Sequence, residues 1–194
     1  MATVPWADTL NDPLAELVEQ AQRGDRVALA ELIRETQDRV YNLAYRILGN
    51  AQEAEDLTQE VFVRMWRALP RFRGDSKFTT WLHTIATNAC LNRKRSLRRQ
   101  LDTQLDAANW LDALPSAEDG PAEDLLARDE RTRLWEMVER LPEKYRLVLT
   151  LFYQQQLTYQ EIAQVLTLPL GTVKAHLNRA RNALAASLEK VGIR

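Results

Sequence analysis

Residues 158–184 read TYQEIAQVLTLPLGTVKAHLNRARNAL, and this stretch decides the fold. Thr158 and Glu161 have the spacing of a capping box, which predicts the start of a helix. Residues 167–169 form a short break, and a second helix is expected from about Leu170, with apolar residues at helical spacing: Val173, Leu177, Ala180 and Leu184. A short helix, a tight turn and a second helix make a helix-turn-helix, whose second helix fits the DNA major groove.

The second helix of this motif has a polar and basic side. Its residues off the apolar stripe are Lys174, His176, Asn178, Arg179 and Arg181. Lys174 and Arg179 are suited to contact base edges or phosphates. A plain antiparallel helical hairpin with a solvated basic face gives the same pattern, so this motif alone leaves two interpretations open.

The rest of the chain also favours helices, because it has six glycines and almost no alternation of Val and Ile. Caps and breakers predict the following helices before the motif: Asp12–Gly24 with Pro13 in its first turn, Asp25–Leu48, Asn50–Pro70 with Glu53 at capping distance, Phe78–Arg99, Leu125–Leu141, and one opened by Pro142. We expect an all-α protein with two helical domains, residues 12–100 and 125–190. A flexible acidic linker is expected over 101–124, where prolines and aspartates gather.

Charge is distributed very unevenly along the 194 residues, although the formal net charge is only −1. Residues 1–60 carry −7, residues 61–100 carry +9, residues 101–130 carry −8 and residues 131–194 carry +5. Two basic blocks separated by an acidic stretch indicate two contacts with a polyanion. Ordinary segregation of charge among solvated helix faces is the alternative.

Several functional classes find no support in the sequence. The single cysteine, Cys90, rules out a disulfide framework and a multi-cysteine metal site. No apolar run reaches the roughly 18 residues of a membrane span, and the N-terminus lacks a signal pattern, so we expect a cytoplasmic protein without membrane insertion. No phosphate-binding glycine loop or catalytic motif surrounds His83 or His176. We expect no enzyme, no metal, no cofactor and no small-molecule substrate.

The segment 54–69, AEDLTQEVFVRMWRAL, joins an acidic start to an aromatic middle. Asp56, Gln59 and Glu60 lie within about one helical turn and can share a face. With Phe62 and Trp66 beside it, that face suits docking on a basic helical partner. Alternatively, the two aromatic residues fill the core of the domain while the carboxylates face water.

The segment 71–95, RFRGDSKFTTWLHTIATNACLNRKR, interleaves aromatic and cationic residues and adds Asn88 and Asn92 at helical spacing. Single-stranded bases offer rings for stacking and free edges for amides, so this composition suits opened nucleic acid. A core role for Trp81 is the alternative. The run Arg93, Lys94, Arg95, Arg98 and Arg99 contains no acidic residue and predicts a phosphate contact, or else a solvated helix end.

Together these segments resemble the extracytoplasmic-function group of bacterial sigma factors, the promoter-specificity subunits of RNA polymerase. The resemblance extends from about Leu14 to Leu188. It is most specific in AEDLTQEVF (54–62), RFRGDSKFTTWLHTIATN (71–88), LPEKYRLVLTLFY (141–153) and LTLPLGTVKAHLNRAR (166–181). It implies a non-enzymatic transcription initiation factor, often a stress-response regulator, that acts only with core polymerase. The first domain would be sigma region 2 and the second sigma region 4.

The resemblance also implies roles for individual residues. Contacts with core polymerase, at its clamp coiled coil, would come from Asp56, Gln59, Glu60 and Phe62. Recognition and melting of the minus-ten element would use Arg73, Gly74, Ser76, Lys77, Phe78, Trp81, Asn88, Asn92, Arg93 and Arg95. Reading of the minus-thirty-five element in duplex DNA would use Pro169, Gly171, Thr172, Lys174, Ala175, His176, Asn178, Arg179 and Arg181. Further implied partners are the polymerase flap and an anti-sigma factor.

Two departures from the family pattern bear on these roles. Thr167 stands where the turn frequently has glycine, and a positive φ there would strain threonine by about 1 kcal/mol. Ala175 and His176 stand where relatives often have Ser-Arg. A histidine cannot make the bidentate contact of arginine with guanine, so the promoter preference of relatives does not transfer.

Two other classes remain as alternatives to a sigma factor. A stand-alone helix-turn-helix regulator would normally dimerise to match paired half-sites, yet the sequence has no sustained heptad seam. A protein–protein adaptor would use its basic blocks on acidic partners. Transcription assays with and without core polymerase distinguish these classes.

Overall fold

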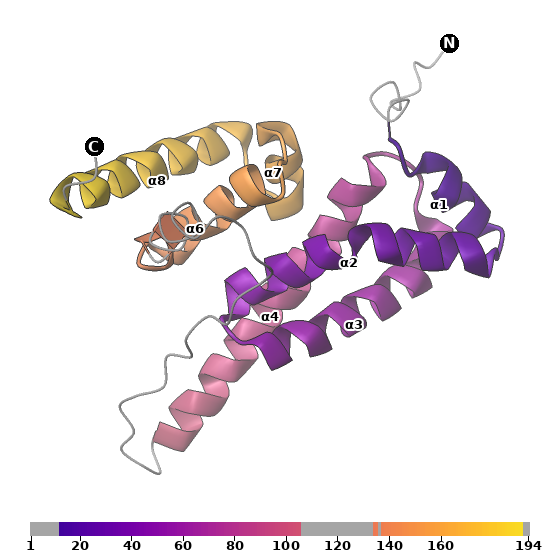
Figure 1. Ribbon diagram of the computed structural model, residues 1–194, viewed down its shortest axis with the longest axis horizontal. Coiled ribbons are helices and arrows are strands. Elements are labelled where there is room, and N and C mark those ends of the chain that lie inside the picture. Colours follow the sequence, from indigo (N-terminus) through magenta and orange to yellow (C-terminus); the bar gives the residue numbers. More distant parts are fainter. Residues whose placement is uncertain (1–11, 106–133, 136, 192–194) are drawn as a thin grey trace, which may run out of the picture. The chain divides into compact units, whose positions relative to one another are not determined.

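The computed structural model describes residues 12–105, 134–135 and 137–191, and every regular element within them is helical (Figure 1). The chain divides into two compact units, Met1–Pro115 and Ser116–Arg194. The prediction of an all-α protein is confirmed. Among the described residues, no helix is long and apolar enough to cross a membrane.

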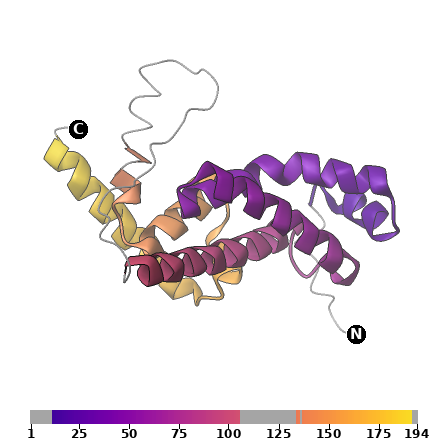
Figure 2. The same cartoon turned by 90° about the horizontal axis from the view of Figure 1, so that it is seen from below.

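The N-terminal unit is a bundle of four helices: α1 (Ala15–Gln22), α2 (Arg26–Leu48), α3 (Ala51–Ala68) and α4 (Phe78–Leu105). A 3-10 turn, Leu69–Arg71, follows α3. The three long helices run alongside one another in both views of the ribbon (Figures 1 and 2), and α1 packs on α2. Their inward faces bury the core of this unit, including Leu32, Leu43, Leu57, Met65 and Leu82.

Local signals set most helix ends in this unit as predicted. The Asp25 carboxylate accepts hydrogen bonds from the backbone N–H groups of Val27 and Ala28, and α2 ends at Gly49 in the left-handed conformation. The Asn50 side chain accepts from the N–H of Glu53 at the start of α3. Cys90 is buried in α4, and burial raises the pKa of its thiol to about 12.

Two predicted boundaries in this unit are wrong. The first helix begins at Ala15, after a turn that contains Pro13, in which the Asp12 carboxylate accepts from the Leu14 N–H at 3.0 Å and the Ala15 N–H donates to the Asp12 carbonyl at 3.1 Å. The helix expected to end at Arg99 continues as α4 to Leu105, through the start of the predicted linker. Residues 106–124 of that linker, and 125–133 of the helix expected next, lie outside the described residues.

The C-terminal unit contains α6 (Glu143–Leu149), a π-helical turn over Thr150–Gln154, α7 (Tyr159–Leu166) and α8 (Leu170–Val191). Residues 134–135 and 137–139 are also helical. The predicted capping box is confirmed: Thr158 and Glu161 bond reciprocally at the start of α7. The core of this unit includes Val148, Leu151, Ile162, Val173 and Leu177.

The turn of the helix-turn-helix contains backbone strain. Thr167, the C-cap of α7, has φ 53° and ψ 44°, which is the left-handed conformation. A residue with a Cβ atom is destabilised there by roughly 1 kcal/mol or more. Glycine lacks that penalty, so it is the favoured residue at this position.

We expect Thr167→Gly to raise the free energy of unfolding of the C-terminal unit by up to about 1 kcal/mol, because it removes this strain. Chemical denaturation of the full chain, followed by circular dichroism, measures the change. The matched control is Thr172→Gly, which makes the same substitution inside α8 and is expected to destabilise. A loss of stability in Thr167→Gly would contradict the strain argument.

Candidate nucleic-acid interface

An aromatic cluster forms where the loop 72–77 enters α4. The ring centroids of Phe72 and Trp81 lie 4.9 Å apart, and that of Phe78 lies 6.1 Å from Phe72 and 5.8 Å from Trp81. Phe78 is fully buried, at 0% exposure, whereas Phe72 and Trp81 are partly exposed. The Phe78 side chain therefore belongs to the core and is not available to DNA in this fold, in contrast to the sequence-based prediction. Trp81 keeps part of its ring at the surface.

One face of α4 continues from this cluster. Asn88 lies about two turns beyond Trp81, and Asn92 lies one turn further, so the three side chains project from the same side of the helix. Both asparagines are exposed, as is Arg95 on the next turn. The loop residues Arg73 and Asp75 are exposed, while Gly74, Ser76 and Lys77 are half-buried. Trp81, Asn88, Asn92 and Arg95 thus form a contiguous surface along α4 that carries two side-chain amides, and Phe78 and Arg93 are not part of it.

Arg93 joins two helices. Its guanidinium donates to the Glu53 carboxylate at 3.1 Å and to the Glu60 carboxylate at 3.2 Å, and its side chain is 32% exposed. Sequence reasoning found no acidic residue near this arginine, because both partners lie on α3, more than 30 residues away in the chain. In this structure Arg93 is paired with two carboxylates and links α3 to α4.

Glu60, which was expected to share an acidic face with Asp56 and Gln59, is 38% exposed and already paired. It accepts hydrogen bonds from both Arg64 and Arg93. Burial alone would raise the pKa of Glu60, but the hydrogen bonds and charges of these two arginines outweigh it and hold the pKa below its usual value. The carboxylate is therefore ionised and already paired at neutral pH.

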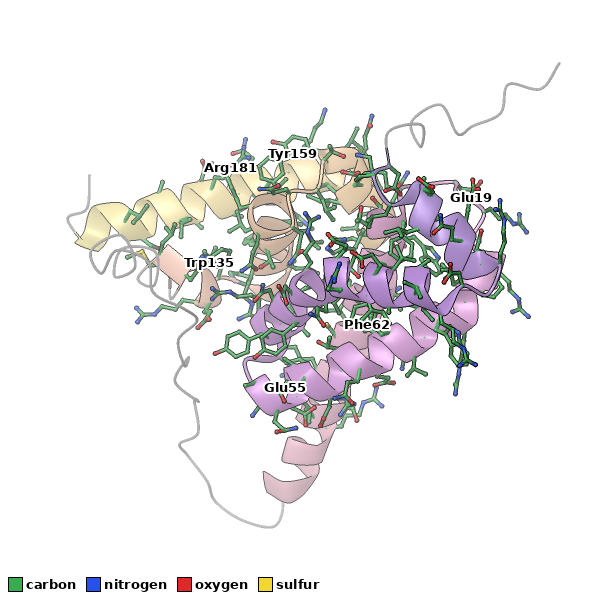
Figure 3. The ribbon with its side chains drawn as sticks, turned by 45° about the vertical axis from the view of Figure 1, so that its right-hand side comes forward. Glu19, Glu55, Phe62, Trp135, Tyr159 and Arg181 are labelled. Carbon is green, nitrogen blue, oxygen red and sulfur yellow. The ribbon has the colours of Figure 1, made fainter. Side chains whose placement is uncertain are left out.

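An exposed stripe runs along α3. Asp56 and Gln59 are exposed on it, as predicted, and Val63 and Trp66 follow at helical spacing with 45% and 57% exposure. Phe62, which was predicted to contact the polymerase, is only 8% exposed and fills the core (labelled in Figure 3). The family resemblance did not assign Val63 or Trp66 to the polymerase contact, although Trp66 was expected beside it. The signal that identifies them is their spacing of four and seven residues from Gln59.

The first half of α8 presents a continuous exposed face. Several predicted contact residues lie on it or beside it with exposed side chains or backbone: Pro169, Gly171, Lys174, Ala175, Asn178 and Arg179. Thr172 is half-buried. Gly171, Lys174 and Asn178 recur at three- and four-residue spacing, so they lie in one row along the helix. This row is the part of the helix-turn-helix that is able to enter a groove.

Arg181 and His176 are directed elsewhere. The Arg181 guanidinium donates to the hydroxyls of Tyr153 at 3.0 Å and Tyr159 at 3.4 Å, and lies 5.2 Å from the ring centroid of Phe152 (Figure 3). The hydrogen bond with Tyr159 raises the pKa of Arg181, although burial opposes it. Arg181 therefore anchors α8 to the π-helical turn and to α7, a role that sequence reasoning did not anticipate.

His176 is half-buried against Tyr145, with ring centroids 5.9 Å apart. Its Nδ1 atom is buried without a hydrogen-bond partner among the described residues. Burial, together with the positive charges of Lys144 and Arg179, lowers the pKa of His176 below its usual 6.5. The imidazole is neutral at pH 7 and is not placed as an exposed contact, in contrast to the prediction.

We expect the imidazole of His176 to titrate below pH 6.5 in an NMR experiment. Because the folded pKa is lowered, the unfolded chain binds the proton more readily, and the C-terminal unit loses stability as pH falls below 6.5. The loss levels off once pH is below the folded pKa. His176→Gln is the control, since it removes this contribution and leaves the acid sensitivity of the carboxylates. A midpoint at or above 6.5 would contradict the assignment.

Within the described residues, no group of three or more His, Cys, Asp and Glu side chains could hold a metal ion. The surfaces on α4 and α8 present amides and cations, together with part of the Trp81 ring, and these groups bind nucleic acid.

Comparison with known proteins gives a consistent result for both units. The family model of Sigma-70 region 2 matches residues 32–100, and that of Sigma-70, region 4 matches residues 131–184. The chain is 35% identical over 176 residues to the ECF RNA polymerase sigma factor SigW of Bacillus subtilis, covering 88% of this chain and 94% of SigW. It is 36% identical over 179 residues to the RNA polymerase sigma-H factor of Pseudomonas aeruginosa, covering 90% and 93%.

A solved structure shares the fold. It is described as the sigma factor RpoE in complex with the anti-sigma factor NepR from Bartonella quintana. The TM-score is 0.67 at 21% sequence identity, and the match covers 82% of this chain and 96% of that chain.

Proposed function

The chain belongs to the extracytoplasmic-function group of the sigma-70 family, and from this premise we propose how its exposed residues divide the recognition of a promoter. It is an alternative sigma factor, a non-enzymatic subunit that binds core RNA polymerase and directs promoter-specific initiation. The observation that carries this conclusion is the match of both sigma regions, in order, to the two units. A stand-alone helix-turn-helix regulator would leave the match of the N-terminal unit unexplained.

We assign region 2 to residues 12–100 and region 4 to residues 125–190, joined by the acidic segment between them. The exposed stripe of α3 is the proposed docking surface for core polymerase. Asp56 and Gln59 offer acceptors for a basic partner, and Val63 and Trp66 supply exposed apolar area beside them. Aromatic anchors with polar neighbours are typical of protein interfaces. The clamp coiled coil is the partner that the family implies, and region 4 meets the polymerase flap.

The exposed face of α4 is the proposed reader of the opened minus-ten element. Asn88 and Asn92 have amides that bond to the edges of unpaired bases, and Trp81 offers part of its ring for stacking. Arg73 and Arg95 are exposed cations for the DNA backbone. Phe78 is buried in the core beneath this face, and Arg93 links α4 to α3 through its ion pairs.

The exposed row on α8 is the proposed reader of the duplex minus-thirty-five element. Lys174 and Asn178 face outward in that row, and Arg179 lies beside it. His176 is half-buried, so the bidentate contact with guanine that an arginine would make is lost at this site. We expect the upstream preference to differ from that of relatives with arginine there.

The net charge and the family indicate how the protein depends on the polymerase and on an anti-sigma factor. A chain of net charge −1 has little long-range attraction for DNA, so the polymerase supplies much of the affinity. We propose that an anti-sigma factor controls the free protein, as the structural relative RpoE is described in complex with one. We also propose a cytoplasmic location, where polymerase and promoter meet.

Transcription of genomic DNA by core polymerase, with and without the purified chain, tests the proposed function. New transcripts with mapped start sites are expected only when both components are present. Sequence-specific binding of the isolated chain to duplex DNA, without an effect on core polymerase, would support a stand-alone regulator instead.

A further inference from the structure

Helix α1 and the turn before it lie outside the region-2 match, which begins at residue 32. They nevertheless contact both ends of the loop Arg73–Lys77, the loop proposed to take part in melting the minus-ten element. Two side chains make these contacts, Asp12 before the helix and Gln22 at its last residue.

Asp12 bonds to two segments at once. One carboxylate oxygen accepts from the N–H of Leu14 at 3.0 Å, in the turn before α1. The other accepts from the N–H of Phe78 at 2.6 Å, across 66 residues of sequence. Phe78 is the first residue of α4, so the carboxylate satisfies a free N–H group at the positive end of that helix. The downstream end of the loop is thereby tied to α1.

Gln22 holds the upstream end. Its side-chain amide donates to the carbonyl of Leu69 at 2.8 Å and to the carbonyl of Phe72 at 2.9 Å. Both hydrogens of one amide group are used, and both acceptors are backbone atoms, so these bonds fix the path of the chain. Phe72 itself donates its N–H to Leu69 at 3.0 Å. The residue just before the loop is therefore fixed from two directions.

We propose that Asp12 and Gln22 are positioning residues that hold the loop Arg73–Lys77 in the form that takes part in recognition of the opened minus-ten element. The inference rests on the proposed function of that loop. Helix α1 connects the two anchors, because Asp12 precedes the helix and bonds to Phe78, while Gln22 is its last residue and bonds to Phe72. A loop fixed at both ends loses less conformational freedom when it binds DNA, and this improves both affinity and discrimination between bases.

The test uses holoenzyme reconstituted with Gln22→Glu. The substitution keeps the size of the side chain but points acceptor oxygens at two carbonyls, so the upstream anchor is lost. Gln20→Glu is the matched control, because it makes the same change on the same helix, where the amide donates to Glu16 within α1. Asp12→Asn is the second variant, since one of its two acceptor oxygens becomes a donor.

The readout is the ratio of affinities for two single-stranded oligonucleotides. One carries the minus-ten sequence taken from the mapped start sites, and the other has a single base changed. We expect Gln22→Glu and Asp12→Asn to lower this ratio by about tenfold, and Gln20→Glu to leave it unchanged. Partial unfolding would weaken binding to both oligonucleotides equally, so the ratio separates positioning from a merely structural role.

An unchanged ratio in both variants, with discrimination intact in the wild-type holoenzyme, would overturn the positioning role alone. Failure of the wild-type holoenzyme to distinguish the two oligonucleotides would overturn the proposed function of the loop, and this inference with it.

Discussion

Phe78→Ala is expected to lower the free energy of unfolding of the N-terminal unit by about 3–5 kcal/mol. The ring is fully buried and packs with Phe72 and Trp81, so truncation leaves a large cavity at the start of α4. Domains of this size are stable by only about 5–15 kcal/mol, so the loss is a large part of the total. Denaturant unfolding followed by tryptophan fluorescence and circular dichroism measures it.

Phe78→Leu is the matched control for this prediction. Leucine keeps most of the apolar volume, and we expect a loss of only about 1–1.5 kcal/mol. If Phe78 instead contacted DNA, as the family resemblance implies, alanine would leave the fold intact and weaken binding to the opened minus-ten strand. Normal stability of Phe78→Ala would therefore contradict the core role and restore the DNA contact.

The aromatic residues show where reasoning from sequence reaches its limit. Phe62 and Trp66 are four residues apart on one helix, and periodicity alone does not decide which of them lies at the centre of the buried face. In the structure Phe62 is buried and Trp66 is exposed, so the core alternative holds for Phe62 and not for Trp66. The burial of Phe78 was equally undecided by the sequence, because Phe78 is the first residue of its helix and no preceding helical turn shows which side of the helix is buried.

Local signals, by contrast, predicted what local interactions decide. The capping box of Thr158 and Glu161 and the end of α2 at Gly49 depend on residues within one helical turn, and both are confirmed. The two ion pairs of Arg93 and the bond from Phe78 to Asp12 join residues 33 to 66 positions apart. Such partners become visible only in the folded chain.

Asn88→Ala is expected to slow formation of the open promoter complex by roughly 10- to 100-fold while closed-complex binding stays near normal. Asn88 is exposed on α4, so the substitution removes an amide without opening a cavity. The bonds it is proposed to make exist only when the base is unpaired, and the duplex complex gains nothing from them. Permanganate reactivity of the minus-ten thymines, measured over time, reports the opening.

Two further variants determine whether this effect belongs to α4. Asn42→Ala makes the same change at an exposed site of α2 and is expected to leave opening unchanged.

Lys174→Ala, on the exposed row of α8, is expected to weaken closed-complex binding and to reduce the slope of log affinity against log salt by about 1, as one phosphate contact is lost. Its opening rate at saturating DNA stays normal, because the minus-ten surface lies on the other unit. Normal melting by Asn88→Ala would remove Asn88 from the proposed strand-binding face. If both variants were equally defective in closed-complex binding and in promoter opening, the two units would not have separate roles in these steps.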